Sequence, residues 1–126
     1  MKLTDQDQRV EELQLALSRT FESRKAPAVT VLDEGESVVF NVTWVVATGR
    51  DTTLDSRCSA SVVFTSSQID RYAEMATIQR RYVQDRMIER LRSVFAQTQQ
   101  GQADPDACSL GLRAEDAWFD APDPLG

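Results

Sequence analysis

The sequence contains no histidine, the side chain that most often serves as a general base and as a transition-metal ligand. It has only two cysteines, Cys58 and Cys108, too few for a four-ligand zinc site without histidine partners. A glycine-rich phosphate loop, a nucleophile elbow and a paired-carboxylate motif are also missing. We therefore expect a protein that is not an enzyme, with no catalytic residue, no metal and no cofactor.

Long apolar runs are missing as well, because polar residues such as Asn41 and Thr43 interrupt the most apolar stretches. We expect neither a signal peptide nor a membrane span, and hence a cytoplasmic protein that does not contact a membrane. Disulfides are rare in that reducing compartment. We accordingly expect two free thiols, with Cys58 buried among apolar neighbours and Cys108 exposed.

The charge of the chain is unevenly distributed. The 126 residues have a net charge of −6, and residues 99–126 contribute −5 of it, from six acidic residues and Arg113. The same segment is rich in proline and glycine and poor in large apolar residues, so it cannot bury enough surface to offset the entropy of ordering. We predict one α+β domain over residues 1–98 and a flexible acidic tail over residues 99–126.

Hydrophobic spacing predicts the elements of the domain. Apolar residues recur at intervals of three and four in residues 4–23, which is typical of an amphipathic helix. Residues 28–65 alternate with a period of two and contain two turn segments, which predicts a three-stranded antiparallel meander. The face predicted to be buried consists of Val38, Phe40, Val42, Trp44, Val46, Leu54, Cys58, Ala60, Val62 and Phe64. The opposite face is rich in hydroxyl groups, and is either solvated or a shallow contact surface for another chain.

Residues 67–98 contain no proline or glycine and have an apolar stripe at helical spacing, so they predict one long helix. The resulting order is αβββα, with both helices on one face of the sheet. Arg80 falls in the middle of the core stripe of the long helix. It either extends to the edge of the domain or is a paired internal arginine at a functional pocket.

A second apolar group on the long helix consists of Met75, Ile78 and Tyr82. It is either covered by the tail or the first helix, or it is the seam of a homodimer. Trp118 and Phe119 are flanked by acidic residues. They are either a short linear motif that binds a protein partner, or an aromatic pair that folds back on its own domain.

Four arginines of the long helix, Arg81, Arg86, Arg90 and Arg92, form either a solvated salt-bridged surface or a nucleic-acid-binding surface. Our leading hypothesis is a small non-enzymatic interaction or regulatory module, homodimeric or bound to a protein partner. The alternative is a nucleic-acid-associated protein that uses these arginines. A third hypothesis is a small enzyme that acts through Arg80, Tyr82 and a carboxylate.

Two resemblances accompany this pattern. The order helix, meander, helix is similar in topology to double-stranded-RNA-binding domains, although Ser67-Gln68-Ile69-Asp70 stands where those domains have a lysine-rich helix start. The run from Cys58 through Arg92, which includes YVQDRMIERL, resembles small proteobacterial proteins of unknown function. Neither resemblance implies an activity.

Overall fold

The computed structural model describes residues 5–21, 23, 25–47, 56–101 and 109–121. In chain order the elements are α1 (Asp5–Ser18), β1 (Ala28–Asp33), β2 (Ser37–Ala47), β3 (Ser56–Thr65), α2 (Ser66–Ala73), α3 (Thr77–Gly101), β4 (Ser109–Arg113) and the short 3-10 helix η2 (Asp116–Phe119). The strands form one sheet in the order β1-β2-β3-β4. The first three strands are antiparallel neighbours, as the meander predicts, and β4 runs parallel to β3.

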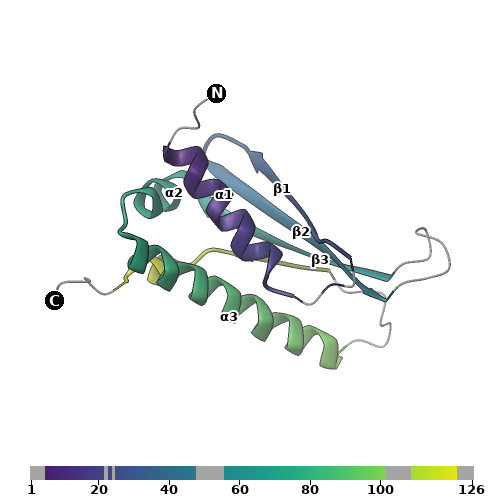
Figure 1. The fold of residues 1–126 in the computed structure, drawn as a ribbon. Coiled ribbons are helices and arrows are strands. Elements are labelled where there is room, and N and C mark those ends of the chain that lie inside the picture. The colour runs from purple at the N-terminus through teal and green to yellow at the C-terminus, as the bar shows by residue number, and fades with distance from the viewer. Residues whose placement is uncertain (1–4, 22, 24, 48–55, 102–108, 122–126) are drawn as a thin grey trace.

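The core lies between the sheet and the helices, and α1 and α3 cross the same face of the sheet (Figure 1). Leu13 and Leu17 of α1 and Met87 and Leu91 of α3 have no exposed surface. Opposite them, alternate residues of two strands are buried as the period-two pattern predicts, namely Val38, Phe40, Val42, Trp44, Cys58, Ala60, Val62 and Phe64. Leu54, also expected on this face, lies outside the described residues. The α+β class and these eight positions of the inner sheet face are confirmed.

One predicted core position, Val46, is wrong. Val46 is 39% exposed, whereas its neighbour Val45 is buried. The register of β2 against β3 shifts between Val45 and Ala47, so Val46 is the extra residue of a β-bulge. An extra residue has no partner across the ladder and interrupts the in-and-out alternation of side chains, so the inward series ends at Trp44.

The single long helix predicted after the meander is two helices, α2 and α3, separated by a turn at residues 74–76. Met75 packs partly buried against the core, and its carbonyl accepts a hydrogen bond from Arg80. The N–H of Ala76 donates to the side-chain oxygen of Gln79 at 3.0 Å. These side chains satisfy backbone groups that helix ends leave unpaired, and so stabilise a break that local sequence does not require.

The segment predicted as a flexible tail contributes a strand and a 3-10 helix to the fold. α3 continues to Gly101, and β4 then adds a fourth strand beside β3. Leu110 and Leu112 pack partly buried against the core, and Trp118 and Phe119 are 4% and 2% exposed. The composition argument failed because these few apolar residues gather at one existing edge of the core. The sheet is therefore four-stranded and mixed, and it extends beyond the predicted domain limit.

Gln68 connects α2 to this C-terminal segment. Thr65 caps α2, and its hydroxyl accepts from the N–H of Gln68 at 3.1 Å. The side-chain oxygen of Gln68 accepts from the N–H of Thr65 at 2.9 Å, which completes a capping box. Its side-chain nitrogen donates to the carbonyl of Ala114 at 3.1 Å and to Asp116 at 2.8 Å. One buried amide thus organises both a helix start and the entry to η2.

Cys58 also differs from its prediction. It is buried on the inner face of β3 as expected, but it is disulfide-bonded and not a free thiol. The free thiol was expected because the predicted compartment is reducing. The sequence did not predict that β3 and β4 pair in parallel, with Ser59 opposite Ser109. Cys108, the other cysteine of the sequence, lies outside the described residues.

Candidate functional site

Arg80 is buried at the turn between α2 and α3, with 6% of its surface exposed. Its Nη1 donates to the carbonyl of Met75 and its Nη2 donates to the hydroxyl of Thr77 at 3.2 Å. Its Nε donates to Oε1 of Glu12 on α1 at 3.0 Å. Arg80 is therefore a paired internal arginine, and a functional pocket beside it stays a prediction. All guanidinium nitrogens have acceptors, as a buried cation requires.

Glu12 is the centre of a polar group that we call the Glu12 cluster, formed with Tyr72, Arg80 and Gln84. The hydroxyl of Tyr72 and the side-chain nitrogen of Gln84 both donate to Oε1 of Glu12, the latter at 2.9 Å. The same Gln84 nitrogen lies 2.8 Å from the hydroxyl of Tyr72. On the outer side, Arg9 contacts Oε2 of Glu12 at 3.2 Å. The carboxylate is therefore surrounded by donors from three helices.

The protonation states in the Glu12 cluster follow from these contacts. Burial raises the pKa of Glu12, but hydrogen bonds from Tyr72 and Arg80 and the charges of Arg80 and Arg9 outweigh it, so the pKa lies below its usual value. Burial, and then the hydrogen bond to Glu12, raise the pKa of Tyr72 well above its usual value. Glu12 is thus charged and Tyr72 neutral at pH 7, which suits a fixed ion pair better than proton transfer.

Tyr82, which we grouped with Arg80, does not belong to this cluster, because Tyr72 is the tyrosine that meets the carboxylate. Tyr82 is half-buried, and the guanidinium of Arg86 lies 5.0 Å from its ring centre. Met75 lies in the turn before α3 and packs partly against the core, whereas Ile78 is 64% exposed. The break between the helices therefore reduces the predicted helical patch to Ile78 and part of Tyr82.

Trp118 and Phe119 are buried in the fold. Their rings lie 6.3 and 6.2 Å from the ring of Phe64 on β3, both in edge arrangements. The indole nitrogen of Trp118 donates to Glu115 at 2.9 Å. The structure supports the alternative in which the pair folds back on its own domain, so neither ring is presented to a partner in this conformation.

The four arginines of the nucleic-acid hypothesis do not line one surface. Arg86 and Arg90 line a cleft beside η2, together with Glu115 and Trp118. Arg92 lies toward the end of α1, where its Nε donates to the carbonyl of Thr20 at 2.8 Å. Arg86 is also 3.4 Å from Glu89, and Arg81 is exposed. A basic surface that follows a phosphate backbone needs its cations side by side, and this division removes that feature.

The outer face of the sheet, opposite the helices, is not covered by any of the elements in the described part of the chain (Figure 1). The register places Leu32 of β1, Val39 of β2, Val63 of β3 and Arg113 of β4 in one row across all four strands. We call these four residues the outer row. Leu32 is 59% exposed, and the two valines are half-buried. The outer face therefore combines an apolar stripe with a terminal cation.

A cleft of about 400 Å³ is lined by three residues of the outer row, Val39, Val63 and Arg113, and also by Glu34. On the same face of the sheet, the hydroxyl of Ser61 donates to the side-chain oxygen of Asn41 at 3.4 Å. The alternation of β2 and β3 pointed to Val39 and Val63 on this side. Leu32 and Arg113 were missed because their place depends on the register of β1 and on the unforeseen fourth strand.

Further features bear on the class of protein. In the described part of the chain, no group of three cysteine or acidic residues could hold a metal ion. None of the described helices is long and apolar enough to cross a membrane. The arrangement is that of a small α+β domain with an ionic cluster inside and one uncovered sheet face.

The comparisons identify the family of this chain. A family model described as DUF3022, protein of unknown function, matches residues 10–113. The chain belongs to this family, and its resemblance to proteins of unknown function is confirmed. Neither a curated protein nor a solved structure matches it. The matched region includes β4 and so extends beyond the helix, meander, helix order of double-stranded-RNA-binding domains.

Proposed function

We propose that the protein is a small non-enzymatic interaction module that forms a homodimer through the outer face of its sheet. The observation that carries this proposal is the exposure of Leu32 in an unbroken row with Val39 and Val63. Exposed apolar groups that are contiguous on a folded domain usually mark a contact surface. The outer row is larger than the remnant of the helical patch around Ile78.

A twofold contact suits the distribution of charge on this face. Arg113 stands at the β4 end of the outer row, and Glu34 follows β1 at the other side of the sheet. A twofold axis through the middle of the row would bring Arg113 of each copy toward Glu34 of the other. Because an isologous interface pairs one patch with itself, this arrangement places opposite charges at both ends of one apolar stripe.

Light scattering during size-exclusion chromatography tests the proposal with matched lysine substitutions. Leu32 on the outer face and Leu15 on α1 are 59% and 58% exposed, so both tolerate a lysine in the folded monomer. We expect a dimeric wild type, a monomeric Leu32→Lys variant and a dimeric Leu15→Lys variant. Ile78→Lys, on the competing helical patch, should remain dimeric.

Two results would contradict this assignment. A wild type that is monomeric up to the highest concentration tested removes the homodimer. A dimer that survives Leu32→Lys and dissociates on Ile78→Lys moves the contact to α3. Circular dichroism of each variant ensures that loss of the dimer is not loss of the fold.

The cytoplasmic location stays a prediction. The disulfide bond at Cys58 counts against it, because disulfides persist mainly in oxidising compartments. The redox state of Cys58 in cells, trapped by alkylation before lysis, decides between the reducing cytoplasm and an oxidising compartment.

A further inference from the structure

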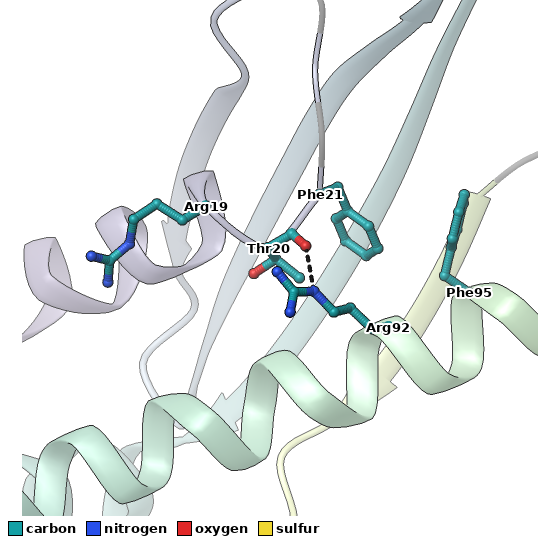
Figure 2. A pocket seen from close by; sticks show the side chains of 5 residues that line it. All are labelled: Arg19, Thr20, Phe21, Arg92 and Phe95. Carbon is teal, nitrogen blue, oxygen red and sulfur yellow. Dashed lines mark hydrogen bonds between the residues drawn. The ribbon is translucent and has the colours of Figure 1, made fainter.

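A second cleft, on the helix side of the molecule, lies between the end of α1 and the C-terminal half of α3. It has a volume of about 360 Å³ and is lined by Arg19, Thr20, Phe21, Arg92 and Phe95. Figure 2 shows the three residues that follow α1 facing the two that rise from α3. This size is at the lower end of the range of about 300–1,000 Å³ for small-molecule sites.

One half of the cleft is basic. Arg92 is held in place by the hydrogen bond from its Nε to the carbonyl of Thr20, and its two terminal nitrogens point toward the side on which Arg19 lies (Figure 2). Neither those nitrogens nor the guanidinium of Arg19 has a hydrogen-bond or ion-pair partner among the described residues. None of the lining residues is acidic. Two guanidinium groups without a carboxylate between them favour an anionic ligand.

The other half is aromatic and rigid. Phe21 stacks on Trp44 with ring centres 3.9 Å apart and planes 7° from parallel. Phe95 meets both rings edge-on, at 5.2 Å from Phe21 and 5.5 Å from Trp44. Trp44 is buried beneath the other two rings, so the wall is supported from inside the core. In Figure 2 the two phenylalanines lie on the opposite side of Thr20 from Arg19.

We propose that this cleft binds a small organic anion whose carboxylate or phosphate contacts Arg19 and Arg92 and whose aromatic body packs against Phe21 and Phe95. The polar half supplies charge-assisted hydrogen bonds, and the apolar half supplies area for ring contacts. The site lies on the helix side of the sheet, so it does not depend on a dimer through the outer face. An anion bound in this cleft would be a small-molecule ligand of the proposed interaction module.

Titrations followed by proton–nitrogen NMR test this proposal on the full chain. The probes are benzoate, phenyl phosphate, the neutral isostere benzamide, and inorganic phosphate, all at one ionic strength. We expect benzoate or phenyl phosphate to shift the amides of Thr20, Phe21 and Phe95 and the indole of Trp44 in a saturable way. Benzamide and inorganic phosphate should produce much smaller shifts, because each lacks one half of the recognised chemistry.

Variants locate the site. Arg19→Gln combined with Arg92→Gln should weaken binding by about tenfold or more, since each removes a charge-assisted contact. Arg90→Gln, an exposed arginine of the same helix outside this cleft, is the matched control and should bind as the wild type does.

Four results would overturn the proposal. Saturable shifts that are missing for both organic anions show that the cleft does not bind them. Equal binding of benzamide removes the role of the arginines, and equal binding of inorganic phosphate removes the role of the phenylalanines. A loss of binding in Arg90→Gln that matches the double variant places the ligand elsewhere on α3.

Discussion

The side-chain nitrogen of Gln68 on α2 donates to the carboxylate of Asp116, 48 residues later in the chain, across 2.8 Å. The same amide group closes the capping box of α2 and binds the carbonyl of Ala114. Gln68 is 6% exposed, so its own side chain has little access to water. This relationship joins the C-terminal segment to the helical layer.

Replacing Gln68 by Leu should lower the free energy of unfolding by about 2 kcal/mol, because the side-chain half of the capping box is lost and the half-buried carbonyl of Ala114 loses its donor. Urea denaturation followed by circular dichroism measures the change. Gln97→Leu, at an exposed position of α3, is the control and should change the stability by less than about 0.5 kcal/mol. Equal effects of the two substitutions would show that Gln68 does not join the segments.

Arg80→Leu tests the role of the Glu12 cluster. The variant leaves the carbonyl of Met75 without its donor and Glu12 without its main buried cation, so we expect a loss of about 2 kcal/mol of stability. Arg80→Lys keeps the charge but cannot supply donors in three directions, and it should recover part of the loss. An Arg80→Leu protein more stable than the wild type would mean that the buried ion pair costs more than it contributes.

The sequence predicted those features of the fold that depend on local periodicity. The alternation from Val38 to Trp44 placed four residues correctly in the core, because inward and outward positions of a strand repeat every two residues. It failed at Val46, where the bulge is set by pairing with β3 and not by the residues of β2 alone. The period of a strand is visible in sequence, whereas its register against a neighbour is not.

The turn between α2 and α3 shows the same limit. No proline or glycine marks it, and residues 67–98 satisfy every local criterion for one helix. The break is stabilised by Arg80, which also pairs with Glu12 on a different helix. Arg80 was singled out because a cation in an apolar stripe needs a carboxylate, but the sequence could not say which one.

The outer row and the cleft between α1 and α3 were beyond prediction for a related reason. The outer row requires β4, which pairs with β3 across a connection that includes both α2 and α3. The cleft joins Arg19 to Arg92, whereas helical spacing alone groups Arg92 with the other arginines of the long helix. Both surfaces arise from contacts between segments far apart in the chain. Composition and periodicity do not predict such contacts.

The stability of the fold should depend on pH through Glu12. The pKa of Glu12 is lower in the folded protein than its ordinary value of 4.5, so its stabilising contribution is present above pH 4.5 and is lost as pH falls below that value. Urea midpoints measured between pH 3 and 7 should therefore decline at the acid end. The Glu12→Gln variant should decline less steeply, because the titrating carboxylate is gone.

Tyr72 should make the free energy of unfolding depend on pH at the alkaline end, as Glu12 does at the acid end. Its pKa is raised in the folded state, so the unfolded chain loses the phenolic proton first and the stability falls as pH rises above 10. Tyr72→Phe should remove this dependence at alkaline pH while leaving the acid limb in place. A Tyr72→Phe protein with an unchanged alkaline limb would assign that limb to other groups.

The disulfide bond at Cys58 and a free thiol at the same position differ in how they react with an alkylating reagent. In urea without a reductant, Cys58 should not react with iodoacetamide, and it should react fully once a reductant is added. Reduction should lower the free energy of unfolding by about 2–5 kcal/mol, the range found when a native disulfide is lost from a small domain. The reduced wild type keeps the buried sulfur of Cys58, so its loss of stability reports the loss of the bond alone. A Cys58→Ala variant would in addition leave a cavity in the core. Alkylation of Cys58 in the denatured, unreduced protein would instead show a thiol, and the expectation of a reducing compartment would then stand.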